Sequence, residues 1–246
     1  MKIALLGYGK MGHIIEETAK ERGHEISFIV DSKNAATFTA ENLAGTDVAI
    51  EFSTPQSVLN NIHICLDAKI PLVVGTTGWN EHLAEIRRKC FELEGTLVYG
   101  SNFSLGVNIL FALNKTLAGW MQNYPSYEPK VEESHHTQKL DAPSGTAITL
   151  AEDVIKILTS KEQWECFCKA DEDPENVQKS KLPVYYTREE NVPGFHKVTY
   201  TSEIDEISIS HNAFNRKGFA LGAVIAAEFA AQHTGFFTPQ DIFNFK

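Results

Sequence analysis

The segment from residue 2 to residue 31 constrains the fold more than any other part of the chain. The apolar run at 2–6 predicts a buried strand, GYGKMG follows at 7–12, and HIIEETAKERG predicts a helix. In such a G-x-G-x-x-G loop the first glycine permits a tight turn, the second lets backbone N–H groups approach a pyrophosphate, and the third allows close helix packing. The segment predicts a dinucleotide-binding site, the alternative being an ordinary strand–helix turn.

The same strand–loop–helix pattern recurs along the first half of the chain. Further strands are predicted in EISFIVD (25–31), VAIEFS (48–53), IPLVVGTTGW (70–79) and TLVYGSNFSLG (96–106), with helices between them. Strands and helices that alternate at this spacing predict a parallel sheet with right-handed crossovers. Ligands bind at the carboxyl ends of such strands, where the loops 7–12, 75–78 and 100–103 fall.

An acidic residue lies at the end of the second predicted strand, the position that binds the ribose of a dinucleotide in folds of this type. Asp31 ends the second predicted strand, nineteen residues after Gly12, and its carboxylate is placed to accept hydrogen bonds from the ribose hydroxyls of NAD(H). Ser32 and Lys33 follow directly, and a lysine there is suited to the 2′-phosphate of NADP(H). The sequence therefore predicts NADH, NADPH or both as cofactor.

The second half of the chain has a different texture. YEPKVEESHHTQK predicts a strand and ITLAEDVIKILTS a helix, while FHKVTYTSE and EISISHNAF alternate apolar and polar residues as antiparallel strands do. GFALGAVIAAEFAAQ predicts a packed helix near the C-terminus. The expected fold is therefore α/β, with a Rossmann-type parallel-sheet domain and a smaller α+β domain whose sheet is mixed or antiparallel.

The segment EESHHTQKLDAPSGTA, residues 132–147, concentrates groups that move protons and bind anions. On either a strand or a helix His135 and Lys139 share one side, and two neighbouring cations resist joint protonation, which suits a proton donor near neutral pH. Gly145 and Thr146 open the next helix and offer N–H groups to a carboxylate. These features predict a small acidic substrate.

Other roles for this segment compete with catalysis. Adjacent histidines on a strand diverge and no zinc spacing appears, so no metal is expected. Either histidine can instead be a satisfied structural residue, and Asp141 and Ser144 are expected to serve as turn and capping residues. The candidate ligands of a metal would be His135, His136, Glu132, Glu133, His196 and His211.

Composition narrows the classes of function. A net charge of −10 and a pI near 5.4 argue against a nucleic-acid-binding surface. The four cysteines have no C-x-x-C spacing, which favours reduced thiols in a cytoplasmic protein. Neither a cleavable leader nor an apolar run of membrane-spanning length is recognised, so no membrane partner is expected.

Five segments together resemble the dihydrodipicolinate reductase (4-hydroxy-tetrahydrodipicolinate reductase) family: GYGKMG, VVGTTGW, GSNFSLGVN, EESHHTQKLDAPSGTA and ISISHNAFNRKGFALGAVIAA. The resemblance implies transfer of a hydride from NADH or NADPH to C4 of a cyclic dicarboxylate after loss of its 4-hydroxyl, on the diaminopimelate route to lysine. It also implies a cofactor domain of residues 1–103 and 217–246, a substrate and oligomerisation domain of residues 104–216, and a homotetramer built through the second sheet, with contacts near 196–214.

The resemblance assigns roles residue by residue. His135 is implied as proton donor and acceptor and Lys139 as proton donor, with His136, Gly145 and Thr146 at the substrate. Arg216 either faces the substrate or is a solvated surface charge. The implied cofactor residues are Gly7, Tyr8, Gly9, Lys10, Met11, Gly12, Asp31, Gly75, Thr76, Thr77, Gly100, Ser101, Asn102 and Phe103.

Two other functions are compatible with the same residues. One is an NAD(P)-dependent dehydrogenase of another small amino or keto acid, because Rossmann folds host many such chemistries. The other is a non-catalytic NAD(P)(H) sensor, which would leave His135 and Lys139 without a use. The chain departs from the family pattern in a short segment between Asp31 and Val48 and in the acidic, cysteine-containing stretch 164–178.

Overall fold

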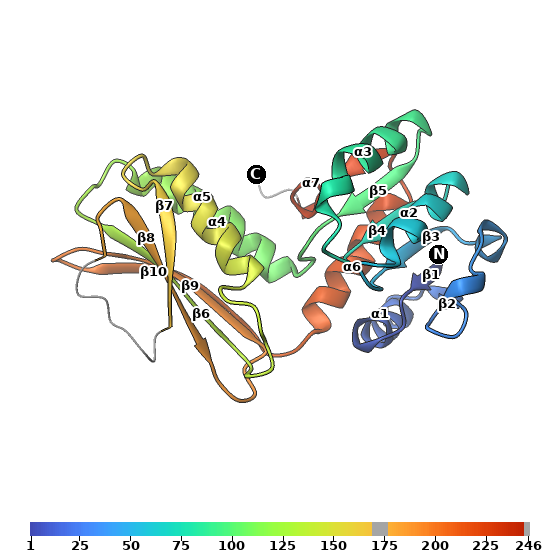
Figure 1. Cartoon of the computed structure of the whole chain (residues 1–246), viewed down its shortest axis with the longest axis horizontal. Coiled ribbons are helices and arrows are strands. Elements are labelled where there is room, and N and C mark those ends of the chain that lie inside the picture. The colour runs from blue at the N-terminus through green and yellow to red at the C-terminus, as the bar shows by residue number, and fades with distance from the viewer. Residues whose placement is uncertain (169–176, 244–246) are drawn as a thin grey trace. The chain divides into compact units, whose positions relative to one another are not determined.

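The computed structural model describes residues 1–168 and 177–243 and divides into two compact units (Figure 1). The first comprises Met1–Leu105 and Arg216–Lys246, and the second comprises Gly106–Asn215. These bounds differ by one or two residues from the domains expected from the sequence. Arg216, expected at the end of the substrate domain, thus belongs to the first unit.

The first unit is built around a six-stranded parallel sheet in the order β11-β5-β4-β3-β1-β2, which confirms the predicted α/β fold. Its strands are β1 (Lys2–Leu6), β2 (Glu25–Val30), β3 (Val48–Glu51), β4 (Leu72–Val74), β5 (Thr96–Tyr99) and β11 (Gly235–Phe237). Its helices are α1 (Lys10–Glu21), α2 (Val58–Asp67), α3 (Leu83–Glu92), α6 (Lys217–Ala230) and α7 (Pro239–Phe243), with 3-10 turns at Ala35–Thr37, Ala40–Leu43 and Asn80–His82.

Both faces of this sheet are buried. Ile3 and Leu5 of β1 pack with residues of α1 and α6, whereas Ala4 and Leu6 pack with residues of α2 and α3. Because side chains alternate along a strand, this places helical layers on opposite faces and explains why the strands read as continuous apolar runs. The loops at the carboxyl ends of the parallel strands meet at one edge, where the first candidate site lies.

The second unit contains a five-stranded mixed sheet in the order β10-β9-β6-β8-β7, as expected for an α+β domain. β6 pairs parallel with β8 and antiparallel with β9, so this central strand is hydrogen-bonded on both sides. Helices α4 and α5 pack on one face through an apolar core. The elements are α4 (Leu105–Met121), β6 (Glu128–His135), α5 (Gly145–Ile157), β7 (Gln163–Cys168), β8 (Lys181–Arg188), β9 (Gly194–Thr201) and β10 (Glu206–Ala213).

The acidic, cysteine-containing stretch begins as an edge strand. Its first residues, 164–168, belong to β7, which pairs parallel with β8. Residues 169–176 of the stretch lie outside the described residues. Among the residues that the structure describes, no helix is long and apolar enough to span a bilayer.

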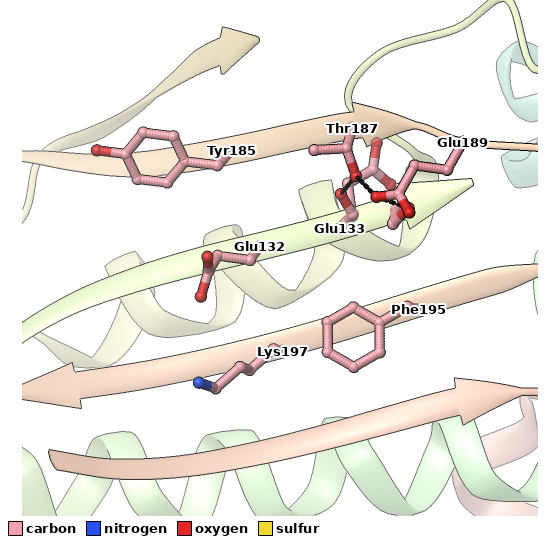
Figure 2. A pocket seen from close by; sticks show the side chains of 8 residues that line it. Glu132, Glu133, Tyr185, Thr187, Glu189, Phe195 and Lys197 are labelled. Atoms are coloured by element: carbon pink, nitrogen blue, oxygen red, sulfur yellow. Dashed lines mark hydrogen bonds between the residues drawn. The ribbon is translucent and has the colours of Figure 1, made fainter. Parts of the chain in front are cut away.

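The face of the second sheet opposite α4 and α5 carries mostly polar and aromatic side chains. Figure 2 shows Glu132, Tyr185, Phe195 and Lys197 in front of the strands, with the helices behind them. Together with neighbouring side chains they line a hollow of about 420 Å³. This face is therefore distinct from the apolar, helix-covered face that leads to the second candidate site.

Candidate active site

The glycine loop joins β1 to α1 in the way that the motif predicts. Gly7 has a φ of +104°, and a Cβ there would overlap the carbonyl oxygen of Phe52. A Cβ on Gly12 would overlap the carbonyl oxygen of Gly7, so the third glycine permits α1 to pack on the turn. Gly9, the N-cap of α1, has open space around its Cβ position. Open space in front of a helix N-terminus fits a pyrophosphate.

A pocket of about 480 Å³ opens at this edge of the parallel sheet. Some of the expected cofactor residues line it, from the glycine loop and from the turn after β4. Phe52, Ser53 and Pro55, which follow β3, also line it and were not expected. The expected residues that line the pocket are Gly9, Lys10, Met11, Gly75, Thr76 and Thr77.

Hydrogen bonds join the loops that follow β3 and β4. The backbone N–H of Ser53 donates to Oγ1 of Thr76 at 2.8 Å. Close to them lies the carboxyl group of Glu51, which is fully buried and accepts hydrogen bonds from Ser53 and Asn61. Burial raises the pKa of Glu51, and the bonds from Ser53, Thr76 and Asn61 oppose that rise.

Asp31 lies just beyond β2, at the carboxyl end of the strand next to β1. Its Oδ1 accepts the backbone N–H of Lys33 at 2.8 Å, and its own N–H donates to Oδ1 of Asn34 at 2.9 Å. These bonds hold the carboxylate in a tight turn, one strand away from the glycine loop. Asp31 does not line the 480 Å³ pocket.

The loop 100–103 follows β5, the next strand beyond β4. Gly100 packs against Pro239 of α7, and Ser101 is exposed. Oδ1 of Asn102 accepts the backbone N–H of Ser104 at 2.9 Å. The Phe103 side chain is only 2% exposed and packs in the core that includes α6. Any contact of Phe103 with a cofactor is therefore restricted to its backbone.

Tyr8 is another expected cofactor residue, and its side chain contacts residues of α1. Its hydroxyl donates to a carboxylate oxygen of Glu16 in α1, and its ring packs against that of His13. A role of Tyr8 toward the cofactor would therefore fall to its backbone, within the glycine loop.

A second cluster of polar side chains, formed by Glu133, His135, Arg188 and His196, lies in the other unit, at the end of the helix-covered face of the mixed sheet. Strand pairing places Glu133 of β6 opposite His196 of β9 and His135 opposite Arg188 of β8. Nδ1 of His135 lies 3.1 Å from Oε2 of Glu133, and Nε2 of His196 lies 3.7 Å from Glu133 Oε2. The rings of His135 and His196 meet edge to face.

Arg188 ties the loop after β6 to this cluster. Its Nη2 donates to Oε1 of Glu133 at 3.1 Å and to the carbonyl oxygen of Asp141 at 2.8 Å. Lys139 lies in that loop, and its Nζ donates to both carboxylate oxygens of Asp141 at 2.8 and 2.9 Å. The sequence pointed to Lys139 but not to Arg188, because only the pairing of β6 with β8 brings Arg188 to this loop.

Ser144 connects the cluster to the N-terminus of α5. As expected, it caps the helix, with Oγ accepting the backbone N–H of Ala147 at 3.2 Å. It also reaches beyond the cap, because its N–H donates to Oε1 of Glu133 at 3.1 Å and its Oγ lies 3.0 Å from Nε2 of His196. Gly145, the first residue of α5, is exposed, and a Cβ there would meet nothing within 4 Å. The helix N-terminus thus leaves room for an anion.

The two remaining expected substrate residues lie at other points. His136 follows β6 directly and is half-buried. Arg216 is an exposed residue at the N-cap of α6 in the first unit.

Charge is distributed unevenly within the cluster. Burial by itself raises the pKa of Glu133, but the adjacent His135 and the bonds from Ser144 outweigh burial and lower this pKa to about 2. Burial and the charge of His135 lower the pKa of His196 to about 3. Near neutral pH the cluster therefore contains an ionised Glu133 and an uncharged His196.

The residue types in this cluster are also those that bind metal ions in proteins. One ligand atom each from Glu133, His135 and His196 lies within 4.8 Å of the others, so these candidate ligands meet. The carboxylate of Glu133 is already bonded to the guanidinium of Arg188 and to the N–H of Ser144. A cation added here would have to share that carboxylate with Arg188, so the arrangement suits a protein ion pair better than a metal.

Comparison with known proteins covers almost the whole chain. Residues 1–103 match the family described as dihydrodipicolinate reductase, N-terminus, and residues 106–243 match dihydrodipicolinate reductase, C-terminus. A protein of Christiangramia forsetii named 4-hydroxy-tetrahydrodipicolinate reductase is 48% identical over 246 residues, which cover 99% of this chain and 98% of that protein. One of Alkaliphilus metalliredigens with the same name is 34% identical, with 98% of each chain covered.

Solved structures share the fold at lower identity. A dipicolinate-bound dihydrodipicolinate reductase from Paenisporosarcina sp. TG-14 superposes with a TM-score of 0.76 at 21% identity, covering 100% of both chains. An amine dehydrogenase from Mycobacterium smegmatis superposes with a TM-score of 0.61 at 10% identity, covering 98% of this chain and 95% of that one. The two-unit fold is therefore shared with enzymes of different names, and the fold alone does not distinguish their reactions.

Proposed function

Because the chain belongs to the dihydrodipicolinate reductase family, we propose that His135 and Lys139 supply the proton of its reaction. The protein reduces 4-hydroxy-tetrahydrodipicolinate to tetrahydrodipicolinate with NADH or NADPH, a step of lysine biosynthesis. When bound, the nicotinamide supplies a hydride to C4 of the ring, which has lost its hydroxyl group. A proton from the protein completes the two-electron reduction.

The observation that carries the proposed proton donor is the 3.1 Å contact between His135 Nδ1 and the buried carboxylate of Glu133. This contact fixes one edge of the imidazole, so His135 is placed to present its other ring nitrogen to the substrate. His196, which is uncharged near neutral pH, is the less suitable donor of the two.

The substrate is a dicarboxylate, and the groups around His135 supply its counter-charges. In this proposal the N-terminus of α5, through Gly145 and Thr146, holds one carboxylate, and Lys139 exchanges its contact with Asp141 for the substrate. His136 is assigned a polar contact with the ring substituents. Arg216 is a candidate for the second carboxylate, the alternative being a solvated surface charge.

We assign cofactor binding to the first unit. The residues that would hold it are those of the glycine loop at 7–12, Gly75 to Thr77 and the backbone of Gly100 to Phe103, with Asp31 at the adenosine ribose. Support comes from the 480 Å³ pocket at the N-terminus of α1 and from the tight turn that holds Asp31. Lys33 is the candidate for a 2′-phosphate, so use of both cofactors is part of the proposal.

We assign the contacts between subunits to the second sheet. We propose a homotetramer built through the face that Figure 2 shows, where Tyr185, Phe195 and Lys197 are placed to meet a second copy. Light scattering of the purified protein tests the number of subunits, and a monomer at working concentrations would contradict the proposed assembly.

The cytoplasm is the proposed location. Cys65, Cys90, Cys166 and Cys168 are all free thiols, a state that a reducing compartment maintains. Cell fractionation tests this location, and recovery of the protein outside the cytoplasmic fraction would contradict it.

Two substitutions test the proton donors. His135→Gln and Lys139→Met should each lower kcat by roughly 100- to 10,000-fold, the usual range for a group in general acid–base catalysis, with the Kd for NADH unchanged. Stopped-flow turnover and fluorescence titration of cofactor supply the two readouts. Loss of NADH binding in either variant, or retention of kcat in both, would remove these residues from the proposed roles.

A further inference from the structure

Glu133 is a buried carboxylate at the centre of the second candidate site. Its side chain has no exposed surface, and polar groups surround both of its oxygens. Oε1 accepts the backbone N–H of Ser144 and Nη2 of Arg188, both at 3.1 Å. Oε2 faces His135 Nδ1 at 3.1 Å and His196 Nε2 at 3.7 Å. One carboxylate thus joins β6, β8, β9 and the N-terminus of α5.

The two oxygens have different partners, and this division has a consequence for His135. Arg188 and Ser144 hold Oε1, and Oε2 lies 3.1 Å from Nδ1 of the imidazole as a close charged contact without the alignment of a hydrogen bond. An ionised carboxylate accepts hydrogen bonds but does not donate them, so a proton is favoured on the ring nitrogen that lies beside it. His135 Nδ1 is then the protonated nitrogen of the neutral ring, and Nε2 is the nitrogen that takes up and releases a proton.

The surroundings of Nε2 agree with this orientation. Gly194, at the start of β9, has no side chain, and a Cβ there would lie 3.2 Å from Nε2 of His135. The ring nitrogen that faces away from Glu133 therefore lies beside a glycine instead of a bulkier residue. A side chain at residue 194 would crowd Nε2, so the glycine permits the position that the ring takes.

Other charged or titratable residues lie near His135 besides Glu133, among them Glu189, whose backbone N–H donates to the carbonyl oxygen of His135 at 2.9 Å. Arg188 pairs with His135 in the sheet, His196 of β9 meets its ring, and Lys139 lies in the loop that follows β6. Arg188 and Lys139 are cations, and His196 is uncharged near neutral pH. Glu133 is the residue whose carboxylate oxygen lies 3.1 Å from the imidazole.

We propose that Glu133 is a positioning residue that fixes the tautomer and orientation of His135 and couples them to the anion-binding N-terminus of α5. This inference rests on the proposed role of His135 as proton donor. Glu133 does not itself exchange a proton with the substrate. It acts through His135 by charge and geometry, and through Ser144 by holding the turn that opens α5.

Glu133→Gln removes the charge and keeps the shape. The amide can still accept from Arg188 and Ser144, but its NH₂ group then faces Nδ1 and favours the opposite tautomer. We expect kcat to fall by roughly 10- to 100-fold, as for other residues that orient a functional histidine, with the Kd for NADH unchanged.

The tautomer itself is measured independently of turnover. Long-range ¹H–¹⁵N spectra of the imidazole groups, assigned with His135→Gln, should show His135 protonated at Nδ1 in the wild-type protein and at Nε2 in Glu133→Gln. This readout stays valid if the wild-type protein fails to reduce the dicarboxylate, so failure of the inference and failure of the proposed function are distinguishable.

Two further variants complete the experiment. Glu152→Gln is the matched control, since this exposed glutamate of α5 loses the same charge outside the cluster around Glu133. It should keep the wild-type kcat and tautomer. Glu133→Asp retains the charge, and should keep the wild-type tautomer even if Glu133→Gln does not fold. An unchanged tautomer in folded Glu133→Gln, or a changed tautomer in Glu133→Asp, would overturn the inference.

Discussion

Gly194 lies directly against the ring of His135, and a Cβ added to it would stand 3.2 Å from Nε2 and 3.4 Å from Cδ2. The glycine is buried, so the new methyl group has little freedom to move away. Glu133 holds the other edge of the ring, which limits how far His135 can shift.

Gly194→Ala should therefore lower kcat as well as stability. We expect a loss of about tenfold or more in kcat, because a small misplacement of a catalytic group is costly, against a change of at most about 1–3 kcal/mol in the free energy of unfolding. Steady-state kinetics and urea denaturation provide the comparison. Wild-type kcat in a variant with clearly reduced stability would show that Gly194 serves packing only.

Gly222 of α6 marks a close helix–backbone approach in the first unit. A Cβ there would overlap the carbonyl oxygen of Phe103, so α6 or the loop after β5 must move. Gly222→Ala should destabilise the protein by about 1–3 kcal/mol or more and weaken cofactor binding through the displaced loop. Thermal denaturation and NADH titration measure both effects.

Gly119 of α4 supplies the control for that substitution. A Cβ there meets nothing within 4 Å, so Gly119→Ala should stabilise the protein by about 0.5–1 kcal/mol through helix propensity. Equal effects of the two alanine substitutions would contradict the packing of α6 on the Phe103 backbone.

Glu51 should make stability depend on pH. Burial raises its pKa in the folded state above the ordinary value, so folding favours the protonated carboxyl group. Its contribution is fully present below the unfolded pKa of about 4.3 and is lost as pH rises through the raised folded value. Glu51→Gln should thus gain stability relative to the wild-type protein as pH rises from acidic to neutral. Urea titrations at several pH values test this, and a pH-independent difference would contradict it.

Removal of divalent metal should leave the activity unchanged. Glu133, His135 and His196 bring three ligand atoms together, but Arg188 and Ser144 already bond the carboxylate. Prolonged dialysis against EDTA, followed by an assay and by elemental analysis of the protein, is the measurement. Activity that disappears with the metal and returns with Zn²⁺ would show that the cluster is a metal centre.

The sequence predicted the fold where the pattern is local. Apolar runs such as 2–6, each followed by a loop and a helix, predicted the parallel sheet because both faces of its strands are buried. β11 was not predicted, because it has only three residues, none fully buried, and begins with a glycine. β7, at the start of the acidic stretch, was not predicted either, because its mostly half-buried side chains give no clear periodicity.

The candidate site could be predicted only where it is continuous in sequence. His135, Lys139 and Ser144 lie within ten residues, and their grouping is visible in the printed chain. Arg188 and His196 reach Glu133 through strand pairing across the sheet, and the register of that pairing depends on tertiary packing. The sequence indicated His196 only as a candidate metal ligand, although the structure places it against Ser144 and Glu133.

The reduction is tested most directly by following absorbance of the reduced nicotinamide. Purified protein would be mixed with NADH or NADPH and with 4-hydroxy-tetrahydrodipicolinate made in place by its synthase. We expect rapid oxidation of the reduced nicotinamide that depends on the dicarboxylate. The ratio of the rates with NADH and NADPH reports the cofactor preference that Asp31 and Lys33 confer. Binding of both cofactors without any oxidation in the presence of the dicarboxylate would contradict the assigned reaction.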